Sequence, residues 1–201
     1  MVRKQKTDAR DAAHLLELLL SGRFPRLWRP TMAERDLRQL VWHRQKLVWM
    51  RTAVANQLHA LAMGEGVCRK KKLFTKKGRV ELEGLALDPW ASRRRQELLR
   101  MLDQMETSLE EFDQAVAEQA EQNSSAVLLM THPGVGPVTS LAFVLTLGPV
   151  ERFGRSKQVV SCLGLNPREH SSGGRQRLGS ISKQGNPMMR SAPLLSDASF
   201  N

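Results

Sequence analysis

The chain has 201 residues, 41% of them hydrophobic, which is enough for one core of fair size or two small ones. Its 31 Lys and Arg against 20 Asp and Glu give a net charge of +11, an excess that favours a polyanionic partner. The absence of tyrosine excludes a tyrosine nucleophile, and two widely separated cysteines without Cys or His companions argue against a structural zinc site.

Residues 6–16 predict a helix that carries two carboxylates on one face. Asp8 and Asp11 are three residues apart, so both project from the same side of the helix. A Mg²⁺ ion that retains several waters binds through one or two such carboxylates. The alternative is helix capping, with Asp8 as N-cap and Asp11 at the third helical position, and the spacing alone favours capping.

Residues 31–124 predict two long helices joined by a basic loop. In the first helix, apolar pairs recur every seven residues between positions 40 and 62. In the second, from Pro89 to about Asn123, apolar residues alternate spacings of four and three, as in a coiled-coil seam. The seam residues are Leu98, Leu102, Met105, Leu109, Phe112 and Val116. The first helix is basic and the second acidic, which favours an antiparallel hairpin or a dimerisation arm.

The segment 64–87, between these helices, breaks the helical pattern and is predicted to be a loop. It carries seven Lys and Arg against three Glu. Such a charge run is either a solvated tip or a contact for nucleic-acid phosphates.

A glycine-rich turn between two apolar segments predicts a helix-hairpin-helix motif. Gly134 and Gly136 supply backbone conformations closed to other residues, and the second helix starts after Pro137. Such a hairpin points free N–H groups outward, so Gly134, Val135 and Gly136 would hold a backbone phosphate without reading bases. The alternative is a plain turn in a helical protein.

A second glycine-rich stretch places two serines among cations. Ser171 and Ser172 precede two glycines. The surrounding cations are Arg168, Arg175, Arg177, Lys183 and Arg190. A serine hydroxyl attacks phosphorus when something accepts its proton or stabilises the developing charge, and arginine forks suit phosphoryl oxygens. Taken alone, the same run is also typical of a flexible loop.

These motifs, in this order, resemble the C-terminal domain of a bacterial insertion-sequence transposase family. The matching runs are Pro133–Gly136, Arg152-Phe153, Leu163–Leu165, Pro167-Arg168, Ser171–Gly173 and Ile181–Asn186. The family pairs an N-terminal RuvC-like domain, which carries the four acids of a DEDD site, with a C-terminal domain that carries a serine nucleophile. Some members are guided by a bridge RNA.

The resemblance also covers the start of the chain. In the family, a Lys-x-Asp-x-x-Asp-Ala segment carries the last two acids of the DEDD site, and Asp8 and Asp11 match them. The family's first Asp and its Glu have no counterpart in this sequence. We therefore expect at most half of a Mg²⁺ site. Because Pro187 and Pro193 interrupt the long apolar helix with which the family continues, we expect a chain truncated at both ends.

The expected fold is mainly α, a long antiparallel helical hairpin or coiled coil followed by a small helical domain with a helix-hairpin-helix motif. We expect residues 1–30 to be a remnant of the RuvC-like domain, 31–124 the hairpin with its basic tip, and 125–201 the C-terminal transposase domain.

The resemblance implies a DNA transposase or site-specific recombinase. Ser172, or else Ser171, would be esterified to DNA. The phosphate-binding side chains would be those of Arg168, Arg175, Arg177 and Lys183, and Asp8 and Asp11 would bind Mg²⁺. Expected partners are DNA, a guide RNA and a second copy bound through the coiled coil, in the cytoplasm at the nucleoid. The alternatives are a non-catalytic, dimerising nucleic-acid-binding fragment and a helical scaffold that binds RNA through residues 70–79.

Overall fold

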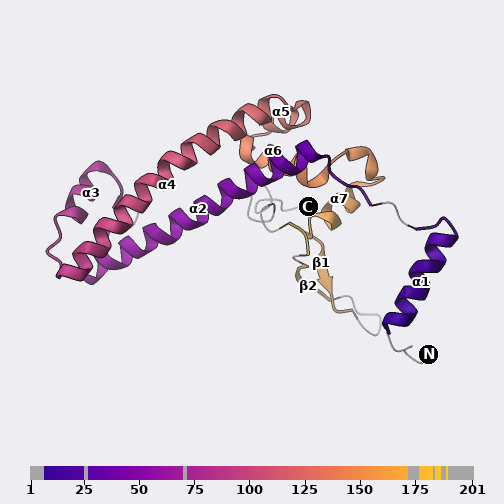
Figure 1. The fold of residues 1–201 in the computed structure, drawn as a ribbon, viewed down its shortest axis with the longest axis horizontal. Coiled ribbons are helices and arrows are strands. Elements are labelled where there is room, and N and C mark those ends of the chain that lie inside the picture. The colour runs from indigo at the N-terminus through magenta and orange to yellow at the C-terminus, as the bar shows by residue number, and fades with distance from the viewer. Residues whose placement is uncertain are drawn as a thin grey trace. The chain divides into compact units, whose positions relative to one another are not determined.

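The computed structural model describes residues 7–24, 27–69, 72–171, 177–182, 184–186 and 189. It divides into two compact units, residues 1–31 and 32–201 (Figure 1). The described residues are mainly helical, as predicted, with seven α-helices and one short β-hairpin. No helix among them is long and apolar enough to cross a membrane.

The first unit contains one helix, α1 (Asp8–Leu20). Its N-cap is Thr7 rather than Asp8, and the Thr7 carbonyl accepts the N–H groups of Arg10 and Asp11 at 3.0 Å. Asp8 and Asp11 still lie in the first turn, where the helix dipole stabilises carboxylates. None of the residues of α1 is buried.

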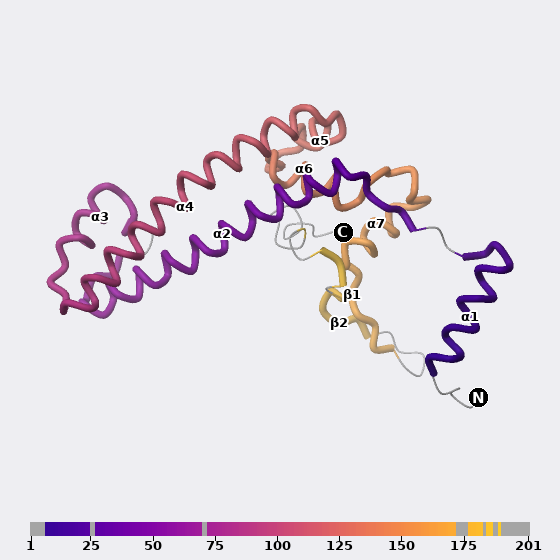
Figure 2. Tube along the Cα trace, in the orientation of Figure 1, coloured from indigo at the N-terminus to yellow at the C-terminus, as the bar shows by residue number. Residues whose placement is uncertain are grey.

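The second unit is built on two 33-residue helices, α2 (Met32–Gly64) and α4 (Pro89–Glu121), which pack antiparallel along their length (Figures 1 and 2). Most of the predicted seam is confirmed: Leu98, Leu102, Leu109 and Val116 are buried, and Met105 and Phe112 are half-buried. The expected pairing of a basic and an acidic helix is also present, as ion pairs of 2.7 Å that join Arg44 to Asp113 and Arg51 to Glu106.

The segment between these helices is a folded cap and not the open loop that its sequence predicts. It contains α3 (Lys76–Glu83), and Leu73 and Leu82 are fully buried beneath it. Arg95 of α4 donates to the carbonyl oxygens of Leu82 and Leu85 at 3.1 and 2.8 Å. The sequence missed α3 because its eight residues are too few to establish a helical period.

The C-terminal part contains short elements, of which α5 and α6 pack on one end of the long helices. They are α5 (Ser124–Met130), α6 (Pro137–Leu147), the 3-10 turn η1 (Val150–Arg152), α7 (Ser156–Cys162), β1 (Pro167–Glu169) and β2 (Leu178–Ile181). Their core is shared with α2 and α4, since Val41 and Val116 are buried against Leu141 and Leu145 of α6. The antiparallel β1–β2 hairpin was not predicted, because its residues are all exposed and lack apolar alternation.

Candidate nucleic-acid interface

The turn between α5 and α6 is exposed at both of its glycines. Gly134 has a φ of +82°, in the left-handed region that favours glycine, and Gly136 is the N-cap of α6. The Val135 N–H donates to the His132 carbonyl at 3.1 Å, whereas neither glycine amide donates to the backbone of another described residue. The amides that this turn can present to a phosphate are therefore those of Gly134 and Gly136, with the first turn of α6 behind them.

Two arginines hold the opposite end of α6. Arg38 of α2 donates from its guanidinium to the Leu145 carbonyl, with Nε at 2.9 Å, and Arg152 donates to the Leu147 carbonyl at 3.1 Å. Burial lowers the pKa of Arg38. Cations at a helix C-terminus bind its last carbonyl groups and complement its dipole. Because α6 is hydrogen-bonded to α2 in this way, the glycine turn at the other end of α6 is held in place relative to α2.

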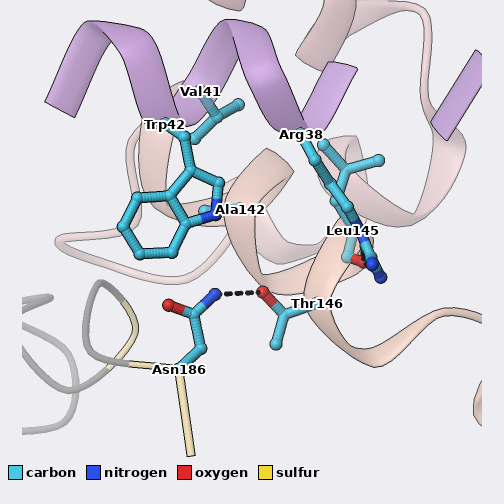
Figure 3. A pocket seen from close by; sticks show the side chains of 7 residues that line it. All are labelled: Arg38, Val41, Trp42, Ala142, Leu145, Thr146 and Asn186. Atoms are coloured by element: carbon cyan, nitrogen blue, oxygen red, sulfur yellow. Dashed lines mark hydrogen bonds between the residues drawn. The ribbon is translucent and has the colours of Figure 1, made fainter. Parts of the chain in front are cut away.

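A small pocket lies beside this joint (Figure 3). Its volume is about 110 Å³, and Trp42 and Ala142 form part of its apolar lining. The Asn186 amide donates to the Thr146 hydroxyl at 3.1 Å across it. Pockets that bind nucleotide-sized ligands enclose roughly 300–1,000 Å³. This pocket is therefore a structural joint between α2, α6 and the segment after β2.

Two glycines cross where the hairpin returns to the helices. A Cβ on Gly164, which has a φ of +69°, would lie 2.9 Å from the Gln184 nitrogen, and a Cβ on Gly185 would lie 2.7 Å from the Gly164 nitrogen. Ser182 adds two bonds, from its N–H to the Asn166 carbonyl at 2.7 Å and from its hydroxyl to the Gly164 carbonyl at 3.2 Å. These motif residues hold the hairpin in place.

The β-hairpin carries Ser171 in a polar arrangement. The Ser171 hydroxyl donates to the Glu169 carboxylate at 2.6 Å and accepts the Arg177 backbone N–H at 3.1 Å. The His170 N–H donates to the Arg177 carbonyl at 2.8 Å. All four residues are exposed. A carboxylate at this distance can accept the hydroxyl proton, which is the requirement for activating a serine.

Sequence reasoning did not single out Glu169. The available signal was its position two residues before Ser171, which keeps the carboxylate within reach of the hydroxyl.

The predicted arginines lie on the same hairpin. Arg168 is in β1, is exposed, and donates to the Ser182 carbonyl at 3.4 Å, and Arg177 precedes β2. The structure therefore joins Ser171 to the Arg177 backbone, and it places the Arg168 guanidinium on the same hairpin at the Ser182 carbonyl. The remaining predicted residues of this loop, Ser172, Arg175 and Lys183, lie outside the described residues.

The metal expected from the resemblance has a partial set of ligands. Asp8 and Asp11 offer hard carboxylate oxygens from one turn of α1, of the kind that Mg²⁺ prefers. Within the described ranges, no group of three or more His, Cys, Asp or Glu side chains is arranged to hold a metal ion. These residues do not build a complete DEDD site, and we derive no catalytic step through a metal.

Comparison with known proteins gives two family matches. A model described as "Transposase IS116/IS110/IS902 family" matches residues 126–195, and a DEDD model of IS110 elements, described as "Transposase", matches residues 1–64.

Similar curated proteins are also bacterial transposases. The "Transposase for insertion sequence element IS1111A" of Coxiella burnetii is 30% identical over 94% of this chain and 53% of its own length. The "Probable family 20 transposase" of Pseudomonas aeruginosa is 27% identical over 94% and 57%. The "Transposase for insertion sequence element IS1328" of Yersinia enterocolitica is 28% identical over 73% and 44%. The chain thus spans about half the length of the curated relatives it matches.

Proposed function

We propose that this chain, which belongs to the IS116/IS110/IS902 transposase family, binds DNA and exchanges its strands through a serine nucleophile. The observation that supports the serine step is the 2.6 Å hydrogen bond from the Ser171 hydroxyl to the Glu169 carboxylate. Ser172, the nucleophile that the sequence favours, is the next residue along the chain.

In the proposed step, the serine oxygen attacks the phosphorus of a DNA phosphodiester. A serine–phosphate ester forms, the bond from phosphorus to one sugar oxygen breaks, and that oxygen takes up a proton as it leaves. Where Ser171 is the nucleophile, Glu169 would receive its proton, since the carboxylate already accepts the Ser171 hydroxyl. Arg168 and Arg177 would neutralise the charge that develops on the phosphoryl oxygens.

The glycine turn would hold the strand in place. Gly134 and Gly136 are exposed just before α6, where the helix dipole favours a phosphate. Contacts of this kind position a backbone without selecting bases. Selection of the target would then depend on another component, and a guide RNA remains our proposed partner for it. Mg²⁺ at Asp8 and Asp11 is likewise a proposal, and it follows from the family.

A covalent trap tests the serine step. A DNA substrate that cannot religate after cleavage should leave a protein–DNA adduct that survives denaturation. Ser172→Ala should abolish the adduct, and persistence of the adduct there together with its loss in Ser171→Ala would move the nucleophile to Ser171. Glu169→Gln should reduce the rate of adduct formation by about 10²–10⁴-fold, the range for loss of a general base. Ser161→Ala, which changes an exposed serine on α7, is the control.

The second candidate function is a non-catalytic nucleic-acid-binding protein. The observation in its favour is the exposed glycine turn before α6, which can hold a phosphate without any catalytic group. If the unmodified chain binds duplex DNA with a steep salt dependence and gives no adduct with any substrate, this second function replaces the first.

A further inference from the structure

The cap at the end of the long helices presents three exposed lysines that form none of its ion pairs. Lys72, Lys76 and Lys77 are exposed, and no described carboxylate forms an ion pair with their amino groups within 4.0 Å. Neither family match extends to this part of the chain, since they end at residue 64 and resume at residue 126.

The carboxylates of the cap are bound to arginines instead. Arg69 pairs with Glu81 at 3.0 Å, and Arg79 pairs with Glu83 at 3.0 Å and with Asp103 of α4 at 2.6 Å. These hydrogen bonds raise the pKa of Arg79 and hold the pKa of Asp103 below its usual range. The arginines therefore stabilise the cap, and the lysines are left outside its ion pairs, although Lys77 is close enough to Glu81 for their charges to interact.

The positions of two of these lysines are unfavourable for α3 itself. Lys76 and Lys77 are the first two residues of the helix, and its first turn contains no acidic residue. The N-terminus of a helix carries a partial positive charge, so cations there are electrostatically unfavourable for the helix. An anion bound at this end of α3 would be attracted both by the lysines and by the helix N-terminus, so the arrangement would then be stabilising. Side chains that destabilise their own helix without forming a compensating ion pair are typical of functional sites.

The cap is also rigid enough to bind without prior ordering. Leu73 and Leu82 are fully buried, and Gly78 packs against the Leu73 carbonyl so closely that a Cβ would lie 2.6 Å from it. The Thr75 hydroxyl accepts the Gly78 N–H at 3.3 Å and fixes the start of α3. A preformed surface loses little conformational entropy when a ligand binds.

We propose that the lysine face of this cap, formed by Lys72, Lys76 and Lys77, binds the sugar–phosphate backbone of a nucleic acid. The ligand is a phosphodiester chain, and either DNA or RNA supplies it. The inference is separate from the serine chemistry, since the face contains no nucleophile and would bind whether or not the hairpin cleaves DNA.

The test compares two full-length triple variants. The first carries Lys72→Gln, Lys76→Gln and Lys77→Gln. The second variant is the control and removes three positive charges elsewhere. It carries Lys46→Gln on α2, Arg155→Gln just before α7 and Lys157→Gln on α7, and all three residues are exposed. Binding of a duplex DNA of about 30 base pairs and of an RNA stem-loop with as many phosphates is measured between about 50 and 200 mM salt. Over this salt range, each lost phosphate contact should lower the slope of log K against log salt by about 0.9, because fewer counterions are released on binding.

The cap variant should weaken binding to at least one probe by about tenfold or more. It should also lower the slope of log K against log salt by roughly 2–3, against less than about 1 for the control. The probe that responds identifies the ligand as DNA or RNA. Equal slopes for unmodified and cap-variant protein with both probes, or equal losses in the two triple variants, would overturn the proposal.

Melting temperatures and the covalent trap distinguish lost phosphate contacts from unfolding and from lost cleavage. Because the lysines oppose the helix dipole, the cap variant should melt at the same temperature as the unmodified chain or slightly higher, so weaker binding cannot follow from unfolding. A triple Lys→Arg variant should restore binding. Loss of the serine adduct with intact cap binding would contradict the strand-exchange proposal alone.

Discussion

At the scale of single residues, the crossing of Gly164 and Gly185 fixes the position of the hairpin that carries Ser171. Gly185→Ala places a methyl group against the backbone of Leu163 and Gly164, which cannot move as a flexible side chain can. We expect a loss of about 1–3 kcal/mol in the free energy of unfolding, typical of overpacking at a closed site.

Urea denaturation checks this expectation, with Gly154→Ala as the matched control. A Cβ at Gly154 would meet only the end of the Gln158 side chain at 3.8 Å, so the control should change stability by less than about 0.5 kcal/mol. Equal stability of the two variants would show that the glycine crossing does not hold the hairpin.

The same residues show how far the sequence could predict the site. The sequence predicts Ser171, Arg168 and Arg177 as site residues because serines next to glycines and arginines suggest phosphate chemistry. Glu169 was missed because a lone glutamate carries no motif, and its bond to Ser171 depends on the turn of a hairpin that lacks apolar alternation. Gly164 and Gly185 were noticed only as parts of a resemblance, since their contact joins positions far apart in the chain.

At the scale of elements, the cap is attached to α4 by the ion pair between Arg79 and Asp103. The Arg79 guanidinium, hydrogen-bonded to Asp103, lowers the pKa of that carboxyl from an ordinary value of 3.8. A carboxylate whose pKa is depressed in the folded state contributes stability that is present above the unfolded pKa and is lost as pH falls through the folded pKa. The contribution of Asp103 should therefore be constant near neutral pH and decline below pH 3.8.

Comparison with Asp103→Asn measures this contribution. The ion pair is half exposed, so the variant should be less stable by no more than about 1 kcal/mol at about pH 7. The difference in melting temperature should shrink as the pH falls below 3.8. A difference that stays constant down to about pH 2.5 would assign the effect to packing and not to charge. Asp36→Asn, at an exposed residue of α2, is the control.

Helices of different length were predictable to different degrees. The two long helices were predicted because a repeat sustained over many turns is unmistakable, and the ion pair from Arg44 to Asp113 confirms the charge argument for their pairing. α3 was not predicted, because its burial depends on Leu73 and Leu82 meeting side chains of both long helices. The basic run was correctly located, but the sequence could not distinguish its arginines, which are paired, from its lysines.

At the scale of the whole molecule, α2 presents an apolar stripe that the intramolecular pairing with α4 leaves exposed. Trp49, Ala53, Ala60 and Met63 follow one another at spacings close to whole turns, and Trp49 and Met63 are 48% and 62% exposed. Such stripes at helical spacing are typical of helix–helix contacts. We propose a second copy of this chain as the occupant, in line with the dimerisation arm that the sequence predicts.

Sedimentation at micromolar concentrations tests the assembly. The unmodified chain should sediment as a dimer, and Trp49→Glu combined with Met63→Glu should give a monomer with an unchanged far-UV circular dichroism spectrum. Trp90→Glu changes an apolar residue of α4 that is 80% exposed and should leave the dimer intact. If the unmodified chain sediments as a monomer at these concentrations, the apolar stripe of α2 is not a dimer interface.

The length of α2 has a geometric consequence for a bound duplex. From Arg38, where α2 holds α6, to Gly64, where the cap begins, the helix rises about 39 Å at about 1.5 Å per residue. One turn of B-form DNA advances about 34–36 Å. The span from Arg38 to the cap is thus slightly more than one turn of B-form DNA, so a duplex lying parallel to α2 would pass from the C-terminal helices to the cap within little more than one turn.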